Sequence, residues 1–255
     1  MASKFYVVWS GKKAGIYRDW DSCKAQVSGV AGAKYKSYKT LAEAEAAFAD
    51  SPAAALKKAK AAPKPKSARR GLKTHSAAEV DEHPAHTKIF TDGGCEPNPG
   101  KAASGVAVYR QGKVAELWFG LFNPRGTNNT AELNAMHQAL LMASRELDAG
   151  VSVAIFCDSQ YSIQCITQWA FNWERKGWKK QGGEIKNLEL IQESYLLYKQ
   201  LRSQVPVLHV NGHVGVEGNE LADRMSIHGI DSKEAAFKCF AEPLDLKKIL
   251  AMRTG

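Results

Sequence analysis

Two apolar runs of the sequence each end abruptly in an aspartate. The first, Lys88–Asp92, is followed by two glycines, and the second is Val151–Asp158. Such runs are typical of strands buried on both faces, and consecutive glycines let another group approach the backbone closely. Because sites in open sheets with parallel strands gather at the carboxyl ends of the strands, we expect the two aspartates to meet. Taken alone, Asp92 is equally typical of a surface turn.

Two further acids extend this candidate site. Glu132 lies in the first turns of a long amphipathic helix predicted through Arg145, where an acid also suits the helix dipole. Asp223 lies on a helix predicted to begin near Gly218–Asn219, after a glycine-rich loop that carries His213. A loop histidine is usually only solvated, but beside an acid it suits proton transfer or product release.

The four acids together indicate a metal site. Converging carboxylates repel one another unless a cation lies among them. Oxygen ligands with few histidines or cysteines favour magnesium or manganese over zinc. The predicted ligands are Asp92, Glu132, Asp158 and Asp223.

The excess positive charge of the chain lies in its first third. The net charge is +9; residues 1–86 carry 16 Lys plus Arg against 8 Asp plus Glu, and residues 87–255 carry 19 against 18. This division indicates that the first third holds a polyanion, although a solvated lysine-rich linker would give a similar count. The predicted parts are a module at 1–50, a flexible basic linker at 51–86, a catalytic domain at 87–232 and a tail at 233–255.

Residues 1–50 are predicted to form a small α/β module. Strands are expected at 5–9, 15–18 and 33–38. A first helix is expected to be capped by Asp21 or Ser22, and a second to open with a capping box of Thr40 and Glu43. Residues 51–86, rich in Ala, Lys and Pro, cannot bury enough apolar surface to become ordered.

Aromatic and basic residues interleave in the module, a combination that holds nucleic acid without reading its sequence. Strand alternation places Tyr35 and Lys36 on opposite faces, so some of the rings are expected in the core. The stretches Phe5–Val8, Gly15–Trp20 and Gly32–Tyr38 resemble the hybrid-binding, or viroplasmin-like, domain over about residues 4–49. The resemblance implies that Trp20, Tyr35 and Lys36 contact an RNA/DNA hybrid.

Four segments of the remaining chain resemble type 1 ribonuclease H, in that family's order, over about residues 87–230. They are Thr91–Gly94, Asn128–Leu133, Asp158–Tyr161 and Gly212–Asp223. The resemblance implies an α/β fold with a mixed five-stranded sheet flanked by helices, preceded by the small three-stranded α/β module. It also implies that the four acids bind two Mg²⁺ ions, for which Mn²⁺ can substitute, and that His213 helps activate water or release product.

The same resemblance implies a set of substrate contacts. The positions that match contacts to sugars and bases are Cys95, Asn98, Asn129 and Gln160. Gly93 and Gly94 would leave room for a nucleic-acid backbone to reach the ions. The stretch Gln168–Lys180 matches the family's substrate-binding protrusion, with Trp169 anchoring its helix. Its predicted phosphate contacts are Arg175, Lys176, Lys179 and Lys180, whereas Glu174 replaces a commonly basic residue and predicts weaker binding.

The sequence therefore predicts endonucleolytic hydrolysis of the RNA strand of RNA/DNA hybrids by a two-metal mechanism. The resemblance to ribonuclease H implies that the products carry 5′-phosphate and 3′-hydroxyl ends. The alternatives are a non-catalytic hybrid-binding protein, which the intact acids disfavour, and a DNA nuclease or strand-transfer enzyme of the same fold. The five cysteines lack the spacing of disulfide or zinc frameworks. Without a secretory signal or an apolar run of membrane-spanning length, the chain is expected to be cytoplasmic and to have no membrane partner. It is also expected to be a monomer.

Overall fold

The computed structural model describes residues 4–30, 32–49, 72–212, 215–241 and 243–255. Contacts divide the chain into two units, Met1–Arg69 and Arg70–Gly255, and each is considered by itself. Residues 51–71 of the predicted linker and His213 lie outside the described residues.

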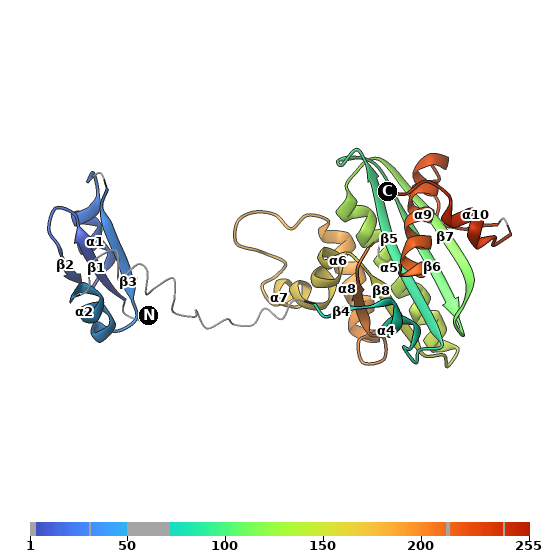
Figure 1. Cartoon of the computed structure of the whole chain (residues 1–255), viewed down its shortest axis with the longest axis horizontal. Helices are drawn as coiled ribbons and strands as arrows, with labels where there is room; N and C mark the ends of the chain where they lie inside the picture. The colour runs from blue at the N-terminus through green and yellow to red at the C-terminus, as the bar shows by residue number, and fades with distance from the viewer. Residues whose placement is uncertain (1–3, 31, 50–71, 213–214, 242) are drawn as a thin grey trace. The chain divides into compact units, whose positions relative to one another are not determined.

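The front unit is a three-stranded antiparallel sheet with two helices (Figure 1). Its elements are β1 (Phe5–Ser10), β2 (Gly15–Tyr17), α1 (Trp20–Val27), β3 (Lys34–Tyr38) and α2 (Leu41–Ala49). The strands follow the prediction, and so does the capping box, in which Glu43 N donates to Thr40 Oγ1 (3.3 Å) and Thr40 N to Glu43 Oε2 (3.2 Å). The predicted cap of α1 is wrong: Asp19, in extended conformation, accepts from Ser22 N (2.7 Å).

The second unit is built on one mixed sheet with the strand order β10-β7-β6-β5-β8-β9-β4 (Figure 1). Its strands are β4 (Thr74–His75), β5 (Thr87–Glu96), β6 (Gly100–Arg110), β7 (Lys113–Gly126), β8 (Val153–Cys157), β9 (Val207–Val210) and β10 (Lys238–Cys239). Its helices are α4 (Ala77–Asp81), α5 (Asn128–Asp148), α6 (Gln160–Gln164), the π-helical turn η1 (Cys165–Trp169), α7 (Ala170–Arg175), α8 (Leu188–Leu201), α9 (Glu217–Ser232) and α10 (Leu246–Leu250).

The fold class predicted from the sequence is confirmed. The five central strands form the expected mixed sheet, in which β5, β8 and β9 run parallel and β6 and β7 are antiparallel. The two-residue strands β4 and β10 extend it at its edges.

The end of the predicted linker belongs to the second unit. Residues 72–86 include β4, which pairs in parallel with β9, and α4, whose capping box joins Ser76 and Glu79. Val80 of α4 is buried in the core. The sequence does not reveal this segment, because two large apolar residues, Leu72 and Val80, and a two-residue strand leave almost no periodic pattern.

Alternate residues of the central strands pack on opposite layers of helices. Ile89 faces a cluster that includes Leu133 of α5 and Ile191 of α8, whereas Phe90 faces one that includes Leu221 of α9 and Ile249 of α10. Since both faces are covered, β8 is buried along its whole length and β5 over its first eight residues, as their continuous apolar runs predict.

Candidate active site

All four predicted acids line one cavity of about 210 Å³. Asp92 lies in β5, Glu132 in the first turns of α5, Asp158 directly after β8, and Asp223 in the first half of α9. The parallel pairing of β5 with β8 ends at Thr91 and Cys157, so Asp92 and Asp158, the residues that follow, lie together, although β5 itself continues to Glu96. A helix from each layer adds one further acid.

Gly93 and Gly94 allow these helices to approach the sheet. A Cβ atom at Gly93 would lie 2.3 Å from the backbone nitrogen of Glu132, and one at Gly94 would lie 2.9 Å from Ser226 Oγ of α9. Neither distance is tolerable for a Cβ atom, so a side chain at Gly93 would push α5 and its acid away from Asp92. The close approach predicted from the glycine pair exists, but the approaching groups are the protein's own helices rather than a nucleic-acid backbone.

The acids occupy an environment that disfavours their charges. Burial raises the pKa of Asp92, and the nearby charges of Asp158 and Asp223 raise it further. Burial likewise raises the pKa of Glu132, with added contributions from Asp92 and Asp158. A cation among these groups would reverse this effect, because it favours the charged form of every acid around it.

The ligand atoms present suit a divalent cation. Glu132 Oε1 accepts from Asn128 Nδ2 (3.4 Å), whereas its buried Oε2 has no hydrogen-bond partner among the described residues. A buried carboxylate oxygen without a donor is costly unless a metal satisfies it. The four carboxylates supply hard oxygen ligands, which is the donor set that Mg²⁺ and Mn²⁺ prefer.

Cys157 lies at the same site and was not predicted there. Its sulfur and oxygens of Glu132 and Asp158 all lie within 4.8 Å of one another. Burial raises the pKa of its thiol, and the charges of Glu132 and Asp158 add to this. Without a cation at the site, these effects favour the protonated thiol. All five cysteines are free thiols, as predicted.

Other residues orient the acids. Asn219 Nδ2 donates to Asp158 Oδ2 (3.1 Å), and Arg224 pairs with Asp223. Asn219 and Arg224 both belong to α9, which also carries Asp223. Their closeness to Asp223 in the sequence is the signal that could have identified them. Gly255 N donates to Asp223 Oδ1 (3.1 Å), and no sequence pattern indicates this contact.

The predicted contacts to sugars and bases lie at or near the cavity. Cys95 lines it, and Asn98 Oδ1 accepts from the backbone nitrogen of Asn128, which also lines it (3.3 Å). Asn129, near the start of α5, and Gln160, at the start of α6, are exposed. Of these four positions, only Cys95 lines the cavity itself.

The predicted protrusion combines packed rings with exposed cations. The ring of Trp169 lies 5.9 Å from that of Tyr161 and 5.8 Å from that of Trp173, and it packs against the core. Glu174 pairs with Lys199 of α8 (2.8 Å), which gives this acid a structural partner. The exposed basic residues are Arg175, Lys176, Lys179 and Lys180.

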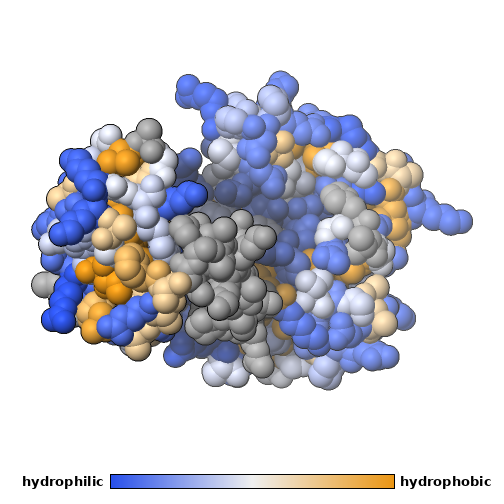
Figure 2. Space-filling view, turned by 60° about the vertical axis from the view of Figure 1, so that its left-hand side comes forward, coloured by the Kyte–Doolittle hydropathy of each residue, from blue (hydrophilic) through white to orange (hydrophobic). Residues whose placement is uncertain are grey.

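The front unit exposes an aromatic cluster. The ring of Trp20 lies 5.5 Å from that of Tyr6 and 5.9 Å from that of Tyr35. Figure 2 shows apolar patches on a largely hydrophilic surface. The large exposed apolar or aromatic side chains of the front unit are Trp20, Tyr35 and Phe48. Lys36 lies apart from this cluster, with its ammonium 5.4 Å from the ring centre of Tyr38.

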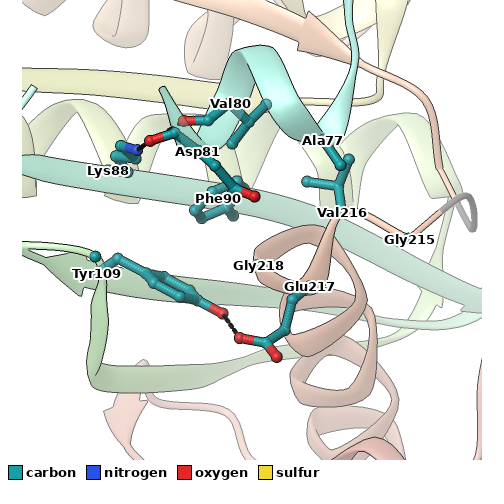
Figure 3. A pocket seen from close by; sticks show the side chains of 11 residues that line it. Ala77, Val80, Asp81, Lys88, Phe90, Tyr109, Gly215, Val216, Glu217 and Gly218 are labelled. Carbon is teal, nitrogen blue, oxygen red and sulfur yellow. Dashed lines mark hydrogen bonds between the residues drawn. The ribbon is translucent and has the colours of Figure 1, made fainter. Parts of the chain in front are cut away.

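A second cavity, of about 340 Å³, lies between α4 and the start of α9 (Figure 3). Tyr109 Oη donates to Glu217 Oε1 (2.7 Å), and Lys88 Nζ donates to the carbonyl oxygens of Val80 (2.6 Å) and Asp81 (2.8 Å). These bonds fasten α4 and α9 to the sheet. None of the predicted site residues lines this cavity.

Comparison with known proteins assigns both units. The ribonuclease H family profile matches residues 84–231, more than half of the chain, and the chain therefore belongs to the ribonuclease H family. The profile described as the ribonuclease H1 N-terminal domain matches residues 4–48. The predicted enzyme class, ribonuclease H, is thus confirmed.

Curated relatives support the same assignment. Ribonuclease H of Pseudomonas putida strain F1 is 39% identical over 150 residues, which cover 58% of this chain and 95% of that protein. Ribonuclease H of Thermosynechococcus vestitus is 39% identical over 158 residues, covering 61% and 96% respectively. Each match covers about three fifths of this chain.

The fold is also similar to a solved structure. LC9-RNase H1, described as a type 1 RNase H with the type 2 active-site motif, superposes with a TM-score of 0.51 at 21% identity, covering 66% of this chain and 86% of that one. At this identity the likeness concerns the fold alone. In the described part of the chain, no helix is both long enough and apolar enough to cross a membrane.

Proposed function

We propose that the chain hydrolyses the RNA strand of RNA/DNA hybrids endonucleolytically at the acid cavity, leaving 5′-phosphate and 3′-hydroxyl ends. The observation that carries the proposal is the gathering of the four carboxylates in one buried cavity of a ribonuclease H family member. Asp92, Glu132, Asp158 and Asp223 are the proposed ligands of two Mg²⁺ ions. When bound, such ions supply Lewis-acid activation and neutralise charge in an in-line displacement at phosphorus.

The chain's own residues orient the acids and the substrate. Asn219 and Arg224 fix the carboxylates of Asp158 and Asp223 before the substrate arrives, so little reorganisation is needed during the reaction. We assign His213 to proton transfer or product release. RNA is distinguished from DNA by contacts to 2′-hydroxyl groups, the donors and acceptors that DNA lacks. The proposed contacts are Cys95, Asn98, Asn129 and Gln160.

We assign hybrid binding without cleavage to the front module, residues 1–50, and catalysis to residues 87–232. The match to the ribonuclease H1 N-terminal domain and the exposed rings of Trp20 and Tyr35 support the first assignment. A tethered second binding module raises the local concentration of substrate at the acid site. The exposed cations of the protrusion are proposed to contact phosphates of the DNA strand.

The test is cleavage of a labelled RNA/DNA hybrid, duplex DNA and duplex RNA, each with and without Mg²⁺. We expect only the RNA strand of the hybrid to be cut, and only with metal. Treatment of the products with phosphatase should remove a terminal phosphate from their 5′ ends. Cutting without metal, equal cutting of duplex DNA, or binding of the hybrid without cutting would contradict the proposal.

A further inference from the structure

His209 of β9 connects the start of the second unit to Asp158. The residue is 5% exposed, and both of its ring nitrogens have partners. Nδ1 lies 2.8 Å from Oγ1 of Thr74 in β4, and Nε2 lies 3.1 Å from the backbone carbonyl oxygen of Asp158. Because a carbonyl oxygen can only accept, Nε2 carries the proton, and Nδ1 accepts from the Thr74 hydroxyl. Two hydrogen bonds therefore connect Thr74 to Asp158: Thr74 donates to His209, and His209 donates to the carbonyl oxygen of Asp158.

Thr74 is held firmly in place for this contact. It pairs with His209 in the parallel register of β4 and β9, at the edge of the sheet (Figure 1). His75 Nδ1 lies 3.2 Å from the carbonyl oxygen of His209, and Ser76 then caps α4. This segment precedes residues 84–231, which match the ribonuclease H profile, so Thr74 is a contribution to the site from outside the family region.

Asp158 is oriented from two directions. Asn219 donates to its carboxylate, and His209 donates to its carbonyl oxygen. Asp158 directly follows the last residue of β8, beyond the pairing of β8 with β9 that ends at Cys157 and His209. The sheet ladder thus fixes the peptide before Asp158, and the imidazole fixes the one after it. A change at the second peptide would turn the carboxylate relative to the other acids.

We propose that Thr74 and His209 are positioning residues of the acid site: Thr74 holds His209 in the tautomer and orientation that fix the backbone of Asp158. The inference deepens the proposed function and rests on it. Neither residue touches the reacting atoms in this proposal, and both act through Asp158. Small errors in the placement of reacting groups reduce rates strongly, so substitution of Thr74 or His209 should lower kcat rather than substrate affinity.

The main test is Thr74→Val in the full chain, which removes the hydroxyl and keeps the shape. We expect kcat on a labelled hybrid to fall about 3- to 10-fold, the rate equivalent of one hydrogen bond, with KM nearly unchanged and the melting temperature lowered by roughly 2–4 °C. Thr74→Ser, which keeps the hydroxyl, should restore kcat. Thr87→Val is the matched control, because Thr87 Oγ1 donates to Glu146 (2.9 Å) at the opposite end of β5 from Asp92. It should leave kcat unchanged.

A double-mutant cycle tests whether Thr74 acts through His209. If Thr74 acts through His209, then Thr74→Val should cost nothing further in a His209→Leu background. Calorimetric titration with Mg²⁺ provides a readout without substrate, in which Thr74→Val should weaken binding several-fold. A normal kcat for Thr74→Val, or failure of serine to restore it, would overturn the inference while leaving the proposed function intact. A wild-type chain that cuts no hybrid would instead refute the proposed function, and the Mg²⁺ titration would still test the positioning.

Discussion

The two units hold their functional side chains in opposite environments. In the front unit Trp20 and Tyr35 are 42% and 44% exposed, whereas in the second unit Asp92, Glu132 and Asp223 are 7%, 5% and 3% exposed. Exposed rings keep their faces available for stacking on bases, and they contact few other side chains, as Trp20 does with Tyr6 and Tyr35. Buried carboxylates depend on helices and strands packed around them. Binding in the front unit should therefore depend on single surface residues, and chemistry in the second unit on packing.

The largest effect is expected from Asp92→Asn. The substitution keeps the shape of the side chain and removes one metal-binding charge. A metal contributes several kcal/mol of transition-state stabilisation, so cleavage should fall on the order of 10³-fold. Hybrid binding, measured by gel shift, should remain, because Trp20 and Tyr35 are untouched. A large loss of binding would show that the two units do not divide the work in this way.

The converse variant is Trp20→Ala. Loss of one stacking ring costs about 1–3 kcal/mol, so the affinity of the front unit for the hybrid should fall between roughly 5- and 150-fold. Single-turnover cleavage at saturating protein should be unchanged. Phe48→Ala is the matched control, since Phe48 is 40% exposed on α2 but has no ring contact with Trp20 or Tyr35 among the described residues. Unchanged binding in Trp20→Ala would assign the front unit another role.

A smaller change, in Mg²⁺ affinity, is expected when residues 253–255 are deleted. Gly255 lines the cavity and donates to Asp223, and Arg253 pairs with Glu96 (2.5 Å) and Asp231 (2.7 Å) at the surface. Deleting residues 253–255 removes a donor that competes with a cation for Asp223. Exposed ion pairs hold such a segment weakly, so we expect Mg²⁺ affinity, measured by calorimetry, to rise only about 2- to 5-fold. Weaker Mg²⁺ binding after the deletion would mean that the segment supports the site instead.

The smallest expected effect is the pH dependence of stability without metal. Because burial raises the pKa of Glu132 in the fold, the folded state retains this proton to a higher pH than the unfolded state does. Stability should therefore fall as pH rises from about 4, near the unfolded pKa, through the folded pKa. With EDTA at pH 8, Glu132→Gln should melt a few degrees above wild type, since about 1 kcal/mol shifts the midpoint by roughly 2–4 °C. The difference should disappear near pH 4, and a constant difference would contradict this explanation.

The sequence alone determined the local structure and the identity of the acids. Continuous apolar runs identify β5 and β8, and Thr40 and Glu43 identify the start of α2, because these signals arise within a few residues. The aspartates that end the two runs could be placed together, because parallel strands bring their carboxyl ends to one edge of the sheet. Alternation in β3 likewise separated Tyr35 from Lys36.

The tertiary structure alone decided what surrounds those acids. Thr74 and His209 are 135 residues apart, and Gly255 and Asp223 are 32 apart, so no periodic pattern connects them. The glycine pair indicated a close approach, but only the packed fold identifies α5 and α9 as the approaching groups. Sequence patterns record which residues a strand or helix buries, whereas contacts between distant segments depend on how the elements pack.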